Sequence, residues 1–257
     1  MPCSNSCVTA LLNSPLAHYA AALLLVVGLT TALLAAQKIQ LRWQPYIAIL
    51  RACLQLAIIA LLLHGILAAP WAVVLFIALM LTTATVTSGK HSRRLHRGQV
   101  ATALAIATGS LIAVALIFAL GLVPYSTQNL VAVAGIIIGG TMTITTLTAR
   151  NFTTLATARQ GEIESWLALG ATAPVAYRDI TKAAITEALT PGLDQTRATG
   201  LVTLPGTFVG ALMGGASPLL AAQLQIAVLA GQTLAGTIAA LLLTSVITRT
   251  RVLPLSA

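Results

Sequence analysis

The carboxylate side chains of this chain are confined to one stretch. All five acidic residues fall between positions 162 and 194, namely Glu162, Glu164, Asp179, Glu187 and Asp194. The segments on either side are apolar and are joined by short neutral or basic turns. What the charged stretch contacts therefore decides the function of the chain.

Two other sequence patterns resemble an ATP-binding motif and a proton relay, but both are incomplete. Residues Ser88 to His91 resemble the end of a phosphate-binding loop, yet His91 replaces the required Ser or Thr, and Ala84 replaces the first Gly. His18 and His64 lie near the ends of apolar runs, where an interfacial position competes with a proton-relay role. We therefore expect no ATP-binding motif, no catalytic residue and no cofactor on this chain. Any transport would draw its energy from a partner.

The composition indicates a membrane protein. The chain is 58% hydrophobic and only 7% charged, whereas a soluble domain is about 25% charged. A bilayer core of about 30 Å needs about 20 apolar residues per helix. We therefore expect residues 1–257 to form a single transmembrane domain, and a water-soluble core is excluded.

We predict an all-α polytopic protein, because backbone groups must be satisfied internally in lipid. Seven spans are expected, in which Pro70 and Pro218 suit the first turn of a helix. They cover residues 17–37, 45–67, 70–88, 99–122, 128–149, 198–214 and 218–248.

The distribution of Lys and Arg sets the predicted orientation. Basic residues occupy alternate loops, which places the N-terminus outside, the C-terminus inside and residues 150–197 in the cytoplasm of a cell (inner) membrane protein. A six-span arrangement would break this alternation. The net charge of +9 is thereby explained without nucleic acid. Cys3 and Cys7 would lie outside, where they could pair or remain free.

The cytoplasmic stretch is predicted to form two short helices. The first covers about 157–169 and ends at Gly170, a residue suited to closing a helix. The second begins after Thr172, with Pro174 in its first turn, and ends before Pro191. These helices could lie on the membrane surface or offer a patch to a cytosolic partner.

The spacing of Glu164, Gly170 and Ile180 resembles the cytoplasmic EAA loop of ABC-transporter permeases. That motif places a Glu six residues before a Gly and an Ile ten residues after it. Here Ser165 and Trp166 replace its two alanines, and the usual Leu-Pro after the Ile is absent. The resemblance implies that this loop docks into a cytosolic ABC ATPase subunit, with a coupling surface made by Glu162, Glu164, Trp166, Gly170 and Ile180.

A longer match is similar to the FetB-like family of bacterial iron-export ABC permeases and plant aluminium-tolerance relatives. It is strongest from Arg159 to Leu229 and weaker before that. The matching positions include Arg159, Ile163-Glu164, Leu167 to Thr172, Ala188-Leu189, Pro191, Asp194, Gly200 to Val202, Leu204 to Gly206, Gly215, Pro218, Ala222 and Gln225-Ile226, with Arg51 and Gln55-Leu56 earlier. Thr207-Phe208 stand where family members often carry Met-Met.

This resemblance implies the permease half of an ABC exporter that moves metal (iron). It also implies a homodimer, with ATP and Mg on the partner subunit. The metal-contacting residues stay unassigned. The alternatives are an ion-coupled secondary transporter, a permease for a nucleotide sugar or other small solute, and a non-transporting scaffold that only recruits a partner.

Several residues are candidates for the transport path. Pro205-Gly206 should interrupt the sixth span, and interrupted helices often line transport sites. Thr141 and Thr145 share one side of the fifth span, although their hydroxyls could instead bond to the preceding turn. Asp194 is expected at the cytoplasmic mouth of the sixth span. Gln225 could line the path or, with Gln223 and Gln232, bridge helices.

Arg51 and Gln55 form a further candidate pair in the second span. A central Arg costs about 2.5–3.5 kcal/mol on insertion scales. Arg51 lies six residues past Pro45, which is about 9 Å along a helix. Its side chain could therefore reach the cytoplasmic surface or face an inward-opening cavity. Gln55 lies one turn further on the same side.

Overall fold

The computed structural model describes residues 15–39, 41, 43–68, 70–93, 95 and 97–249, with the side chains of 15–17 and 62–70 excepted. Cys3, Cys7 and the side chain of His64 lie outside this description. The described residues are helical apart from short turns and one isolated bridge between Thr199 and Thr203. The predicted all-α polytopic class is confirmed.

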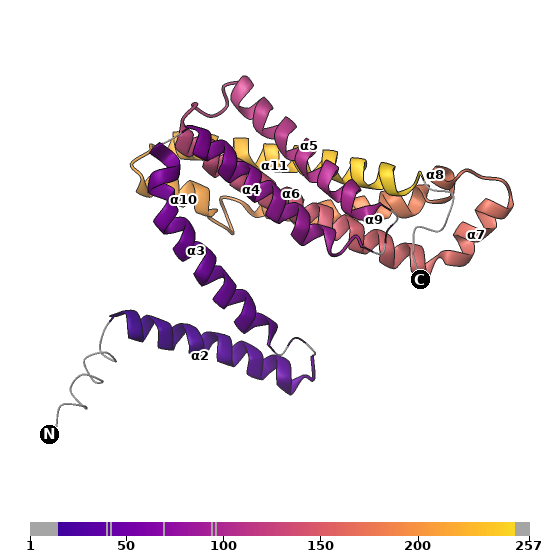
Figure 1. The fold of residues 1–257 in the computed structure, drawn as a ribbon, viewed down its shortest axis with the longest axis horizontal. Coiled ribbons are helices and arrows are strands. Elements are labelled where there is room, and N and C mark those ends of the chain that lie inside the picture. Colours follow the sequence, from indigo (N-terminus) through magenta and orange to yellow (C-terminus); the bar gives the residue numbers. More distant parts are fainter. Residues whose placement is uncertain are drawn as a thin grey trace. The chain divides into compact units, whose positions relative to one another are not determined.

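Ten helices follow one another along the described chain (Figure 1). They are α2 (Pro15–Ala36), α3 (Gln44–Ala68), α4 (Pro70–Gly89), α5 (Gly98–Ala119), α6 (Thr127–Ala158), α7 (Gln160–Ala168), α8 (Ala173–Ala176), α9 (Arg178–Ala198), α10 (Gly206–Met213) and α11 (Pro218–Ile247).

The chain divides into two compact units, residues 1–65 and 66–257. In the first unit, α2 and most of α3 are apolar helices that bury little of their surface, since only 11% and 0% of their candidate spans are buried. Thr31 and Tyr46 join them by a hydrogen bond of 3.4 Å. Apolar helices so exposed within a chain are suited to contact with lipid.

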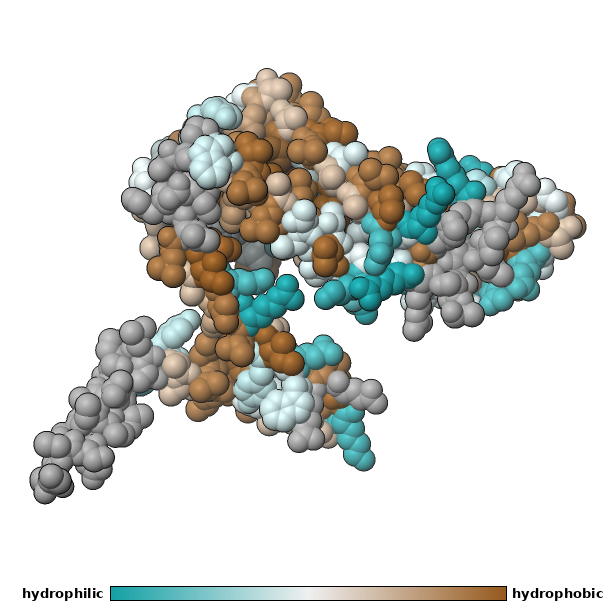
Figure 2. Space-filling view, viewed as in Figure 1, coloured by the Kyte–Doolittle hydropathy of each residue, from teal (hydrophilic) through white to brown (hydrophobic). Residues whose placement is uncertain are grey.

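In the second unit, α4, α5, α6 and α11 pack into a helical bundle through small residues. A Cβ atom at Gly109 of α5 would lie 2.5 Å from the Ala235 carbonyl oxygen of α11, so the two backbones approach closely. Gly231 and Gly236 of α11 likewise accommodate Ile117 and Ile144. The visible side of α5 is covered by hydrophobic residues (Figure 2).

The packing fixes the direction of each helix within the bundle. Moving along α11 from Gly231 to Gly236, the facing residues of α6 advance from Ile137 to Ile144. α6 and α11 are therefore parallel. The chain that joins the end of α6 to the start of α11 must consequently return along the bundle once.

That return passage is not a regular transmembrane helix. Six helices among the described residues are long and apolar enough to span a membrane, and the predicted span over 198–214 is not one of them. α9 ends at Ala198, residues 199–205 are non-helical, and α10 has only 8 residues. The bounds predicted for this span are wrong, and the interruption expected at Pro205-Gly206 already begins at Thr199. α9, the segment 199–205 and α10 together form a broken passage.

The predicted end of the second cytoplasmic helix is also wrong. α9 does not stop before Pro191 but continues through it to Ala198. A proline inside a helix removes one backbone hydrogen bond. Packing offsets that loss, because Ala188 lies in a core cluster with Ile144 of α6 and Ala240 of α11. The fifth span is likewise longer than predicted, since α6 runs on to Ala158.

Candidate functional site

The first candidate surface is α7, which follows α6 after Arg159. Glu162 and Glu164 are exposed, and Glu164 accepts a hydrogen bond of 2.8 Å from Gln160. Trp166 is 47% exposed. Ile163 is fully buried and fixes α7 to the bundle core. An exposed aromatic beside carboxylates on an anchored helix is a surface suited to binding a protein partner.

Gly170 shapes the turn after α7 as the sequence predicts. Its φ of +86° lies in the left-handed region, which only glycine adopts readily. The Gly170 N–H donates to the Leu167 carbonyl, and the Ala171 N–H donates to the Trp166 carbonyl, both at 3.0 Å. This pair of bonds is the Schellman motif. It leaves Leu169 82% exposed at the tip.

Ile180 has a different environment from the other residues of the predicted coupling motif. It is 3% exposed and lies in one core cluster with Ile163, Phe152 and Tyr177. The motif therefore divides into an exposed part on α7 and a buried part at the start of α9. Ile180 can act only through this packing, which links α7 to α9.

Tyr177 is a residue that the sequence reasoning missed. Its ring lies 5.6 Å from that of Phe152, and its hydroxyl is buried without a hydrogen-bond partner among the described residues. Burial raises the pKa of Tyr177 to about 12. The sequence offered one signal for this role, because Tyr177 is a large aromatic residue among alanines and fills the junction of α8 and α9.

A hollow of about 540 Å³ opens beside the α7–α8 turn. Its walls comprise Leu167, residues 170–174 and Arg249, which follows α11. The end of the bundle that carries α7 and α8 thus combines an exposed Trp, two exposed carboxylates and Arg249. Such a mixture of apolar and charged groups is typical of protein interfaces.

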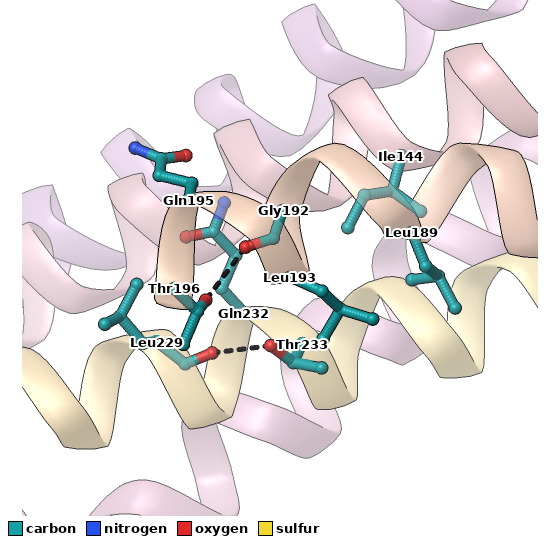
Figure 3. A pocket seen from close by; sticks show the side chains of 9 residues that line it. All are labelled: Ile144, Leu189, Gly192, Leu193, Gln195, Thr196, Leu229, Gln232 and Thr233. Carbon is teal, nitrogen blue, oxygen red and sulfur yellow. Dashed lines mark hydrogen bonds between the residues drawn. The ribbon is translucent and has the colours of Figure 1, made fainter. Parts of the chain in front are cut away.

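The second candidate site lies where α9 meets α11 (Figure 3). Gln232 extends from α11 toward the turn of α9 between Gly192 and Thr196. Thr196 donates to the Gly192 carbonyl at 2.8 Å. The small cavity between the helices has a volume of about 20 Å³, which suffices for one water molecule.

This site lies near the middle of the apolar layer. Gln232 packs over Gly140 of α6, where a Cβ atom would collide with the Gln232 side chain. Gly140 is ten residues from Arg150, which is about 15 Å along a helix and half of a bilayer core. Asp194, between Leu193 and Gln195 of the cavity lining, lies at the same level of the bundle, and its role in the transport path stays a prediction.

Asp194 forms an ion pair with Arg197 at 2.8 Å. Both side chains are largely exposed, at 59% for Asp194 and 77% for Arg197. Pro205 and Gly206 lie beyond them, where the non-helical segment ends and α10 begins. The predicted interruption thus starts at Thr199, earlier than Pro205-Gly206, because Gly200 adopts a φ of +94°.

The remaining path candidates are placed as follows. Thr141 and Thr145 are fully buried, and their hydroxyls donate at 2.7 Å to the carbonyls of Ile137 and Thr141, as in the back-bonding alternative. Gln225 is 5% exposed, and its Oε1 has no partner among the described residues. Its amide does not bridge helices through that oxygen.

Arg51 and Gln55 are both exposed on α3, in the unit 1–65. Their exposure is compatible with either position that the sequence leaves open. Within the part of the chain that the structure describes, no three His, Cys, Asp or Glu side chains gather into a metal site. The metal-contacting residues thus stay unassigned.

The fold and these sites define a multi-pass helical membrane protein with one broken passage. Residues 16–252 match the uncharacterised protein family UPF0014, and the chain belongs to that family. No solved structure matches it.

Three similar proteins illustrate the family. The rice (Oryza sativa subsp. japonica) UPF0014 membrane protein STAR2 is 35% identical over 79% of this chain and 72% of its own length. Protein ALUMINUM SENSITIVE 3 of Arabidopsis thaliana is 34% identical over 81% and 77%. The probable iron export permease protein FetB of Escherichia coli (strain K12) is 29% identical over 69% and 70%.

Proposed function

We propose that this chain is the membrane-spanning subunit of an ABC exporter, driven by a separately encoded ATPase that binds at α7. The observation that carries the proposal is α7 itself. It leaves Glu164 and Trp166 exposed, with Leu169 at its C-terminal end, while Ile163 anchors it to the bundle. An anchored surface helix that leaves large apolar side chains exposed is suited to a partner that covers them.

The proposed substrate is a metal ion, with iron as the first choice. The support is that the Escherichia coli relative is named a probable iron export permease. Metal is here the cargo and not a resident cofactor. In the working assembly, two copies of the chain would bind two ATPase subunits, which carry ATP and Mg.

The proposed transmission runs from α7 into the bundle through one core cluster. Ile163 of α7 lies in the same cluster as Tyr177 and Ile180, which begin α9. A force on α7 would therefore move the start of α9. α9 continues to the broken passage at mid-depth, so closure of the ATPase pair would change the passage that substrate must cross.

Co-purification with the ATPase tests this proposal. We expect Trp166→Ala to weaken ATPase binding at least tenfold, because truncating a Trp hot spot at an interface costs about 2 kcal/mol or more and a factor of ten corresponds to about 1.4 kcal/mol. Trp71→Ala is the matched control, since Trp71 is 72% exposed on α4 and lies at the opposite end of the bundle. Equal binding by both variants, in chains that are equally well folded, would refute the assignment of α7.

One observation favours the second candidate, an ion-coupled secondary transporter. The sequence argued against it because the predicted spans lacked internal carboxylates. α9 now brings Asp194 to mid-depth, where an ionisable residue is a candidate for coupling. Flux of metal into proteoliposomes under an ion gradient, without ATPase or ATP, would establish this candidate in place of the first.

A further inference from the structure

The two sides of α9 differ sharply in character. Ile180, Ala184 and Ala188 recur every four residues and are buried in the bundle. The other side is largely exposed and mostly polar, with Leu193, 38% exposed, among its residues. This polar stripe of α9 consists of Asp179, Lys182, Thr186, Glu187, Thr190, Asp194 and Arg197.

The stripe starts outside the apolar layer and reaches its middle. At its beginning, Asp179 follows the α8 junction at the charged end of the bundle. Further along, Leu189 and Thr196 line the small cavity with Gln232, which packs over Gly140. The last two turns of the stripe therefore lie at the depth of the bilayer centre.

An apolar environment cannot satisfy this side of α9. A Lys, Arg or Asp side chain that faces lipid at the centre of a spanning helix is strongly unfavourable on insertion scales. The Asp194–Arg197 pair compensates part of this cost, but more than half of each side chain stays uncovered. An apolar helix packed over the stripe would leave the same groups unhydrated.

We propose that the polar stripe of α9 lines a water-filled passage, which runs from the α8 end of the bundle to the non-helical segment 199–205. The inference rests on the proposed transport function and identifies the side chains along which a polar substrate moves. It does not depend on which partner supplies the energy.

The far end of the passage has a different chemistry. Leu201, Val202 and Leu204 are 97%, 81% and 65% exposed in the non-helical segment. A hydrogen bond of 2.9 Å from the Gly200 N–H to the Thr203 carbonyl holds the turn. The polar stripe therefore ends at an apolar, largely exposed segment.

Cysteine accessibility in lipid nanodiscs tests the passage with the full chain. Cys3, Cys7 and Cys53 are first replaced by Ser, and Thr190→Cys is then introduced. The Thr190 hydroxyl donates only to the Thr186 carbonyl one turn back, so the change removes no contact between helices. Leu234→Cys is the matched control, because Leu234 is 39% exposed on α11 close to the depth of Gln232.

The probe is a positively charged methanethiosulfonate that reacts with thiolates in water. Thr190→Cys is expected to react at least tenfold faster than Leu234→Cys. Equal, slow reaction of the two would overturn the proposal. Slow reaction together with oxidative crosslinking of Thr190→Cys between two copies would also overturn it, because the stripe would then form a dry interface. Neither result depends on ATPase binding, which is measured separately at α7.

Discussion

At the scale of single residues, the predicted coupling motif separates into side chains in different environments. Glu164 and Trp166 are exposed, whereas Ile180 is buried at the junction of α7 and α9. Sequence spacing alone treats the three as one set. The same distinction applies to Thr141 and Thr145, whose hydroxyls bond to their own helix.

Tyr177 provides a prediction at this scale. Its buried hydroxyl has no partner among the described residues, and an unpaired buried polar group costs about 1–3 kcal/mol. We therefore expect Tyr177→Phe to fold normally and to unfold at an equal or higher temperature in detergent. Tyr125→Phe is the control, since Tyr125 is 77% exposed. A lower Tm for Tyr177→Phe would show that the hydroxyl is hydrogen-bonded.

The pH dependence of the same pair of proteins gives a second measurement. Burial raises the pKa of Tyr177 to about 12, above the ordinary value of 10.0. The unfolded chain therefore releases this proton first as the pH rises. Stability contributed by the neutral phenol is complete below pH 10 and is lost as the pH rises toward 12. The Tm advantage of Tyr177→Phe should thus be larger at pH 11 than at pH 8, and a constant difference would contradict the assignment.

At the scale of elements, close helix packing decides which chain segments are regular. α9 passes through Pro191 because Ala188 and its neighbours pack against α6 and α11. The segment 199–205 lacks such support, since Leu201 to Leu204 are exposed. Local propensity ends a helix only where tertiary contacts do not extend it.

The contact between α5 and α11 provides the prediction at this scale. Gly109→Ala places a methyl group against the Ala235 carbonyl of the facing backbone, which cannot move without separating the helices. Overpacking of this kind costs about 1–3 kcal/mol. Gly139→Ala is the control, because a Cβ atom there meets no atom within 4 Å. The Tm measured in detergent should be lower for Gly109→Ala than for the unaltered chain, and it should be unchanged for Gly139→Ala.

At the scale of the whole molecule, the parallel directions of α6 and α11 require a return passage between them. Six regular spans and one broken passage reconcile the alternating basic loops with the lack of a continuous helix over 198–214 among the described residues. The orientation of the bundle in the membrane remains the prediction from the Lys and Arg distribution.

Labelling of intact cells with an impermeant thiol reagent tests this arrangement in the background without native cysteines. Leu219→Cys, at the start of α11, should react as readily as Tyr125→Cys, which precedes α6. Leu169→Cys, 82% exposed beside α7, should react only after the cells are permeabilised. Equal labelling of Leu169→Cys and Leu219→Cys before permeabilisation would mean that the chain between them does not cross.

The sequence by itself determined the membrane class, the helical fold, the family and the approximate bounds of the regular spans, except for the end of α6. Apolar length, Lys and Arg placement and glycine at a helix end are local properties, so they can be recognised without coordinates; Gly170 is the clearest case. Only the tertiary structure decided that Asp194 lies at mid-depth and Ile180 in the core. It also showed that the sixth passage begins in a polar helix. The reason is that burial depends on neighbouring helices. Hydropathy indicated that α9 is a surface segment, whereas its alanines pack against α6 and α11 and hold it along the bundle with its charged side exposed.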